Sequence, residues 1–273
     1  MRDYKYKFIF ISLSPLQQLM AESQKKIVLY TAGTPNGHKA SILLEELGIP
    51  YEVKAIDISK NTQKEEWFLK INPNGRIPAI VDQNNNDFPV FESGALMLYL
   101  VDKYDKDHKL SYPHGSDKYW EVVSWLFFQN AGVGPMQGQA NHFFRYAPEK
   151  IPYGINRYQN ETRRLYSVLE NRLKQNGDWL VGDRMTIADI ANFGWVNWAF
   201  WAGVEINEFP LLSAWVDRIN AREAVKRGLD VPTKFTLKED AKDKEKLEKE
   251  AKEVSAWIVQ GQKEDAEKKY NQQ

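Results

Sequence analysis

The segment Asn72–Leu100, NPNGRIPAIVDQNNNDFPVFESGALMLYL, constrains the fold of this chain more than any other part of it. Two short apolar runs are separated by the polar loop QNNND, and a longer apolar stretch follows them directly. Ile77 precedes Pro78, and a residue before proline is held extended rather than helical. The pattern therefore predicts two strands and then a helix, over Arg76–Val81, Phe88–Phe91 and Ser93–Tyr104.

The same segment carries chemistry that suits a small zwitterionic peptide. A cis Ile77–Pro78 bond, which such a turn favours, leaves the N–H and C=O groups of Ile77 facing outward as an unpaired strand edge. An extended peptide can join an edge of this kind. Ser93 stands where the helix begins, and free N–H groups with the positive end of the helix dipole bind carboxylates there. Glu92 beside it is suited to an ammonium group, so the sequence predicts a peptide pocket.

The residues ahead of this segment complete an α/β domain, which we expect over residues 26–106. Ile42, Leu43 and Leu47 recur at helical spacing, and Gly48 follows them at a position typical of a helix end. The resulting order β-α-β-α-β-β-α is a thioredoxin-like pattern, whose sites lie where strands and helices end. The elements expected before Asn72 are a strand over Lys26–Leu29, a helix in HKASILLEEL, a strand in YEVKAIDI and a short helix in EEWFLKI.

The chain changes character after the polar segment Asp105–Asp117, and we expect an all-helical domain over residues 116–232. Residues 233–273 form a charged tail in which Lys and Glu predominate and apolar residues are sparse. A solvated helix with a thin packing stripe is the expected structure of the tail, and a partner-binding role for it stays open. The helical stretches predicted in the domain are Ser116–Arg145, Pro148–Gln175, Ile187–Ala202 and Leu211–Arg222.

Residues 1–25 are expected to form an extension outside both domains. Basic residues precede a short apolar run there, as in a secretory signal, but Ser, Pro15 and two Gln break the run. We therefore expect no cleaved signal. A span of about eighteen apolar residues is also lacking, so no transmembrane helix is predicted.

Composition excludes several classes of function. The 37 Lys and Arg residues balance the 37 Asp and Glu residues, so net charge predicts neither nucleic-acid nor acidic-lipid binding. The chain contains no cysteine, which excludes disulfide scaffolding, thiolate metal sites and any mechanism that uses an enzyme thiol. The four histidines, His38, His108, His114 and His142, lack the spacing of a metal-binding set, so we expect no metal.

Three residues with reactive side chains are given structural roles. Asp189 closes the sequence TIAD, where Thr186 and Asp189 form a capping box, so we expect a helix cap rather than a catalytic acid. Tyr30 lies within a strand and is expected to pack. His38 is expected to be a surface residue at the start of a helix rather than a base.

The combined motifs make the chain similar to a known family. A thioredoxin-like domain followed by a helical domain resembles the cytosolic glutathione S-transferases, and the likeness covers residues 26–232. More narrowly, the chain resembles the Nu class and the fungal transferases related to the yeast nitrogen-regulatory prion protein. The segments that carry this likeness are YTAGTPNGHKASILLEELG, NPNGRIPAIVD, VFESGALMLYL, WLFFQNAGVGPMQGQANHF, YGINRYQNETRRLY and WLVGDRMTIAD.

The resemblance implies glutathione as co-substrate and assigns roles to individual residues. Two alternatives stay open: Asn36 with Gly37 is also an ordinary turn pair, and Arg157 also suits a surface ion pair. The catalytic roles fall on Thr34, Asn36 and Arg157, and the glutathione contacts on Asn36, Gln63, Arg76, Ile77, Glu92 and Ser93.

The missing cysteine decides between glutathione chemistries. A cycle in which the enzyme's own thiol becomes glutathionylated is impossible, so the thiolate of bound glutathione must attack the second substrate directly. We predict a disulfide reductase with transferase activity, acting on a small disulfide or electrophile. The resemblance also implies a cytoplasmic homodimer. A glutathione-binding regulatory or scaffold protein, and an accessory domain of a translation complex, remain as alternatives.

Overall fold

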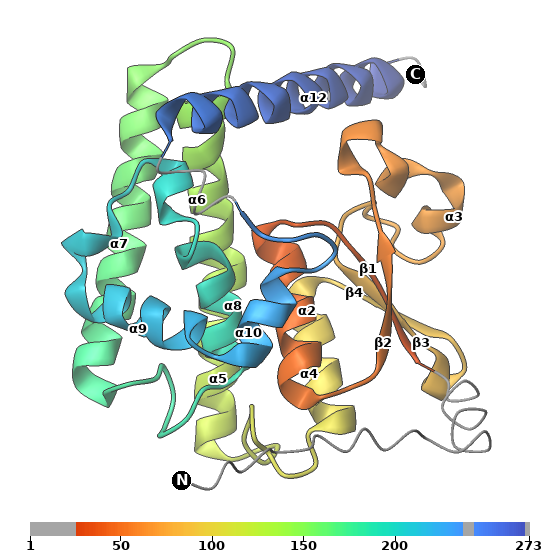
Figure 1. Cartoon of the computed structure of the whole chain (residues 1–273), viewed down its shortest axis with the longest axis vertical. Helices are drawn as coiled ribbons and strands as arrows, with labels where there is room; N and C mark the ends of the chain where they lie inside the picture. The colour runs from red at the N-terminus through yellow and green to blue at the C-terminus, as the bar shows by residue number, and fades with distance from the viewer. Residues whose placement is uncertain (1–25, 237–242, 271–273) are drawn as a thin grey trace, which may run out of the picture.

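The computed structural model describes residues 26–236 and 243–270, so the extension over residues 1–25 and residues 237–242 and 271–273 of the tail lie outside the described residues. Two parts follow one another along the chain (Figure 1). Residues 26–104, the sheet half, contain all four strands of the described chain, and the helical half, residues 117–236 and 243–270, contains helices and no strand. This is the thioredoxin-like domain and helical domain that the sequence predicts.

The sheet has the strand order β2-β1-β3-β4. β1 runs parallel to β2, which requires a crossover helix, and antiparallel to β3, which β4 continues as a hairpin. β3 begins three residues later than predicted, because Pro78 has no N–H group to donate to the ladder. The strands are β1 Ile27–Thr31, β2 Tyr51–Ala55, β3 Ala79–Asp82 and β4 Phe88–Phe91.

Local signals in the sequence define the ends of α2, the crossover helix of the sheet half. The Thr34 hydroxyl caps its first turn by accepting from the Gly37 N–H group at 3.1 Å. Gly48 ends the helix with φ of 64°. The helices of this half are α2 Pro35–Leu47, η1 Ile58–Lys60, η2 Thr62–Lys64, α3 Glu66–Leu69, η3 Gln83–Asn85 and α4 Ser93–Tyr104.

The helical half consists of α-helices, two π-helical stretches and short 3₁₀-helices. The stretches η4 and η5 have π-helical geometry, which is often found at functional sites. No helix in the described ranges is both long and apolar enough to cross a membrane. The elements are α5 Asp117–Phe128, η4 Gln129–Val133, α6 Gly134–Asn141, η5 His142–Tyr146, α7 Pro152–Asn176, α8 Ile187–Val196, η6 Ala199–Ala202, η7 Ile206–Glu208, α9 Pro210–Asn220, α10 Glu223–Leu229 and α12 Lys244–Tyr270.

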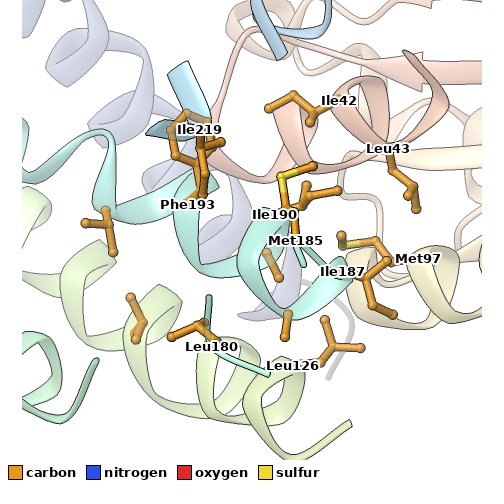
Figure 2. Close-up of a cluster of buried hydrophobic side chains, with 14 of the residues drawn as sticks. Ile42, Leu43, Met97, Leu126, Leu180, Met185, Ile187, Ile190, Phe193 and Ile219 are labelled. Atoms are coloured by element: carbon orange, nitrogen blue, oxygen red, sulfur yellow. The ribbon is translucent and has the colours of Figure 1, made fainter. Parts of the chain in front are cut away.

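The main core surrounds α8, which is buried along most of its length. Figure 2 shows Ile187 and Ile190 of α8 among side chains of α2, α4 and α5. Burying each aliphatic side chain of this size contributes about 1.5–3 kcal/mol. Because these side chains come from both halves, the core joins the halves into one body.

The predicted capping box at the start of α8 is present. The Thr186 side chain accepts from the Ala188 N–H group, and the Asp189 carboxylate accepts from the Thr186 N–H group at 2.9 Å. Asp189 also accepts from the Leu180 N–H group at 2.9 Å and from the Trp215 indole at 3.0 Å. The carboxylate is fully buried, and desolvation raises its pKa above the usual range. These bonds confirm a structural role, because Asp189 ties three segments together.

Replacing Asp189 with alanine is expected to lower the free energy of unfolding by about 3 kcal/mol, because four buried donors lose their acceptor. Urea unfolding followed by tryptophan fluorescence measures this loss. Alanine at the exposed Asp217 is the matched control and should change the stability by less than about 0.5 kcal/mol. Equal effects of the two variants would contradict the role assigned to Asp189.

Candidate functional site

A cavity of about 420 Å³ lies between the sheet half and the helical half. Seven of the eight residues that the sequence singled out as catalytic or ligand-binding line it, and Arg157 does not. The cavity is lined by Thr34, Pro35, Asn36, Ile58, Gln63, Asn72, Asn74, Arg76, Ile77, Pro78, Glu92, Ser93, Trp195 and Trp257.

The N-terminus of α2 forms one wall of the cavity with Thr34 and Asn36. The Asn36 Oδ1 atom accepts from the Trp195 indole N–H group at 2.9 Å. Because an indole N–H can only donate, this bond determines which end of the Asn36 amide carries the oxygen. The Nδ2 donors of Asn36 and the hydroxyl proton of Thr34 have no acceptor among the described residues, so both are available to an anion in the cavity.

Ile77 lies just before β3, with the Ile77–Pro78 peptide bond in the cis form. The expectation of an unpaired strand edge is wrong in one respect. β3 is an inner strand, and its pairing with β1 and β4 begins at Ala79. The main-chain groups of Ile77 lie ahead of this pairing and have no hydrogen-bond partner in the described chain, so they can still serve a peptide ligand.

The start of α4 forms the opposite wall. Glu92 has φ of 65°, a left-handed conformation that is rare outside glycine and that often marks a functional position. The exposed Glu92 carboxylate accepts from the Asn74 side chain at 3.5 Å. Ser93 is buried and opens a twelve-residue helix. An acidic side chain therefore lies next to free helical N–H groups, as an amino acid ligand requires.

Gln63 and Arg76 lie at the end of the cavity that faces the tail. Gln63 belongs to η2 and is buried, and its Oε1 atom has no hydrogen-bond partner among the described residues. Arg76 is exposed, so its guanidinium group keeps its hydration. The pair supplies one amide and one mobile positive charge.

The structure does not bring Arg157 to this site. It lies on the outer side of α7, exposed, and lines a separate hollow of about 680 Å³ with Met136, Tyr153 and Arg164 among others. Its guanidinium group lies 5.9 Å from the ring of Tyr158. In this conformation of the single chain, Arg157 adds no charge to the wall of the main cavity.

Of the other two residues that were given structural roles, Tyr30 is as expected and His38 is not. Tyr30 packs against Trp67 and Phe68, as expected, and burial raises its pKa. His38 is not at the surface: it is 1% exposed, and desolvation lowers its pKa to about 4. The rings of Trp198 and Phe235, distant in sequence, pack near it. His38 is therefore a neutral core residue.

Three residues at the site went unnoticed in the sequence. Trp195 orients Asn36, and Lys39 lies buried beneath Ser93, its Nζ atom 3.1 Å from Ser93 Oγ. Trp257 reaches the cavity from α12 in the tail. Lys39 falls in the predicted helix HKASILLEEL, next to residues at apolar spacing, but a helical period does not reveal a charge that is buried by another domain.

The tail helix α12 rests on both halves, and Figure 1 shows it crossing from the helical half toward the loops beside α3. Leu247 and Ala251 pack in a cluster with Trp198 and Trp201. The Ser255 hydroxyl donates to the Tyr146 carbonyl at 2.6 Å. At the other end, Asn61 of the sheet half donates to Glu264 at 3.1 Å. The predicted thin packing stripe is present, and one of its residues, Trp257, lines the cavity.

Replacing Leu247 with aspartate is expected to detach α12, because a charge cannot remain in the apolar cluster. Losing about 1.5 kcal/mol of packing corresponds to about tenfold faster trypsin cleavage within residues 244–270. Alanine at the exposed Glu253 is the control and should leave the cleavage rate unchanged. Unchanged cleavage in both variants would mean that the cluster does not hold the helix.

Models of known protein families match both halves of the chain. The family model described as the N-terminal domain of glutathione S-transferases matches residues 25–102, and the model of their C-terminal domain matches residues 156–223. The chain is 43% identical over 207 residues to the disulfide-bond oxidoreductase YfcG of Escherichia coli. That alignment covers 74% of this chain and 94% of the bacterial protein.

Solved structures give the same result. A glutathione transferase homologue from Lodderomyces elongisporus with two GSH per subunit is 49% identical, with a TM-score of 0.74, over 77% of this chain and 100% of that one. The glutathione transferase URE2P6 from Phanerochaete chrysosporium, in complex with oxidized glutathione, is 42% identical, with a TM-score of 0.73, over 77% of this chain and 97% of that one.

Proposed function

Because the chain belongs to the glutathione S-transferase family, we propose that it binds glutathione in the cavity of about 420 Å³ and is a glutathione-dependent disulfide reductase with transferase activity. The observation that carries this proposal is the bond from Trp195 to Asn36 Oδ1. It leaves the amide donors of Asn36 free at the positive end of α2, where a thiolate can be stabilised.

To be reactive at neutral pH, the glutathione thiol must be deprotonated, which requires the site to stabilise the thiolate by a few kcal/mol. A free thiol has a pKa near 8.5, and lowering it by about two units requires about 2.7 kcal/mol of stabilisation for the anion. One or two charge-assisted hydrogen bonds contribute this much. Thr34 and Asn36 supply two such donors, and the backbone N–H groups of the first turn of α2 add their dipoles.

The rest of glutathione matches the remaining walls of the cavity. The free main-chain groups of Ile77 suit the backbone of its cysteine residue, as an added strand would pair. Glu92 suits the α-ammonium of the γ-glutamyl end, and Ser93 with the start of α4 suits its α-carboxylate. Gln63 and Arg76 lie toward the other end, where the glycine carboxylate needs donors.

Because the chain has no cysteine, glutathione supplies the attacking thiolate in both steps of the reaction. The thiolate of the first glutathione attacks one sulfur of the disulfide RSSR, forming GSSR and releasing RS⁻. A second glutathione thiolate then attacks GSSR, forming GSSG and releasing the second RS⁻, and each RS⁻ takes up a proton. The relatives with two GSH per subunit or with oxidized glutathione hold the reactant and the product of this reaction. The protein contributes orientation and thiolate stabilisation.

We further propose a cytoplasmic homodimer, as the family resemblance implies. Exposed aromatic side chains support a protein partner: Phe88 and Phe91 lie on β4, at the edge of the sheet, and Trp120 and Phe127 lie on α5. Large exposed apolar side chains of this kind are typical of interfaces. Sedimentation velocity of the purified chain at micromolar concentration measures its mass, and a monomer there would contradict this part of the proposal.

The purified chain is expected to reduce hydroxyethyl disulfide at the expense of glutathione, well above the uncatalysed rate. Coupling to glutathione reductase and NADPH follows the GSSG produced. A rate equal to the uncatalysed one, with glutathione binding intact, would contradict the reductase and favour a conjugating transferase or a regulatory binder. Lack of glutathione binding would contradict the whole proposal.

Replacing Asn36 with alanine is expected to lower kcat/KM about a hundredfold, because one preorganised donor to the thiolate is lost. Tm should fall by no more than about 4 °C, since one hydrogen bond to Trp195 disappears. Stopped-flow kinetics and calorimetry give the two quantities. Trp195→Phe is the companion variant: it removes the same bond but keeps the amide, so it should lose less activity than Asn36→Ala. Equal relative losses in rate and stability would remove Asn36 from the catalytic machinery.

A further inference from the structure

Lys39 is a basic residue that is buried, and burial destabilises a charged side chain. Its side chain is 1% exposed, and its Nζ atom donates to Ser93 Oγ at 3.1 Å and to Gln129 Oε1. No carboxylate lies within ion-pair distance of it in the described chain. Gly194 makes room for the stem, because a Cβ there would lie 3.1 Å from Lys39 Cγ.

A purely structural role is served poorly by an ammonium group. Burying a charge without a counter-charge destabilises the fold, and a methionine of similar length would fill the same space without that cost. Desolvation lowers the pKa of Lys39 to about 7. The Glu92 carboxylate acts on this ammonium group from beyond ion-pair distance, so among the described residues Lys39 has no carboxylate in direct contact.

A cavity adjoins this charge. It has a volume of about 230 Å³ and shares Asn36, Glu92, Ser93 and Trp195 with the main cavity. Lys39 lines it from below, next to the N-terminus of the twelve-residue helix α4. A buried cation and a helix start that meet in one cavity form a site for an anion.

The bond between Lys39 and Ser93 also has a direction. In its charged form Lys39 only donates, so Ser93 Oγ then accepts from it and the Ser93 hydroxyl proton is turned away from Lys39. The Ser93 hydroxyl is then left as a donor for whatever lies in the cavity. Lys39 thus acts on the ligand through Ser93 as well as through its charge.

We propose that Lys39 is the positioning residue that holds the α-carboxylate of the γ-glutamyl group, by orienting the Ser93 hydroxyl toward it and by supplying the buried positive charge that balances it. This inference rests on the proposed function, since it assigns a further residue to the glutathione site. Glu92 then faces the ammonium of the same amino acid group, so the two ends of the zwitterion meet opposite charges.

The proposal predicts that ligand binding and proton binding are linked. Because desolvation lowers the pKa of Lys39 to about 7, its charged fraction without ligand falls as the pH rises from 6 to 8. A bound carboxylate favours the charged form and raises this pKa, so binding at pH 8 takes up a proton. Among the elements packed against Lys39, α4 presents the charged Glu92, whereas η4 and α8 present Gln129 and Trp195, which do not titrate in this range.

The test is titration calorimetry of the full chain with S-hexylglutathione at pH 8, in buffers that differ in ionisation enthalpy. This probe has no free thiol, so thiol ionisation contributes nothing. The unmodified chain should take up between half a proton and one proton per site. Lys39→Met should take up at least half a proton less and bind about ten to a hundred times more weakly. Lys226→Met, on the exposed face of α10, is the matched control and should behave like the unmodified chain.

The Tm values of the Lys39 variants distinguish a positioning role of this residue from a packing role. Lys39→Met should keep or raise Tm, because it removes a buried charge, and Lys39→Gln should lose the proton uptake while keeping a donor to Ser93. Absence of proton uptake by the unmodified chain would overturn the role of Lys39 even if neither variant folds. So would parallel losses of affinity and Tm in Lys39→Met. If the unmodified chain does not bind S-hexylglutathione, the proposed function itself fails.

Discussion

The position of α2 is the constraint on which the site depends. The helix begins at the cavity with Thr34 and Asn36, and it packs on α4 of its own half and on α8 and α10 of the helical half. The Ser41 hydroxyl donates to the Gly228 carbonyl at 2.6 Å, and a Cβ on Gly228 would lie 2.6 Å from the Cα of Ile42. Backbones this close leave α2 no room to shift. The direction of its dipole is therefore determined by the core that joins the two halves.

Two groups that can only donate hydrogen bonds determine the polarity of the cavity. The Trp195 indole turns the oxygen of Asn36 away and leaves its amide donors exposed, and the Lys39 ammonium does the same for the hydroxyl of Ser93. Both donors were missed in the sequence, although Trp195 lines both cavities and Lys39 lines the smaller one. The cavity consequently presents donors to anions at Asn36 and at Ser93, while Glu92 presents an acceptor in the same lining.

Much of the fold and the site could be predicted from the sequence where local chemistry decides the structure. The helix over Ser93–Tyr104, the strand over Phe88–Phe91 and the capping box of Asp189 follow from short-range patterns, and all three are present. The residues that could not be predicted depend on distant contacts. His38 is buried by rings more than 150 positions away, and Trp257 reaches the cavity only because its helix folds back over both halves. An amphipathic pattern shows that a helix has an apolar face, but not which surface that face covers.

The tail helix α12 has a kinetic consequence. It is held at Tyr146 on one side of the cavity and at Asn61 on the other, and Trp257 lies between these two contacts. A helix cannot stretch, so any separation of the halves that widens the cavity must break one of the two attachments. A substrate that fits only after the halves separate can then enter no faster than one end of α12 detaches. For such substrates the observed rate of binding would level off as their concentration rises. Its upper limit would be the rate at which one end of α12 detaches.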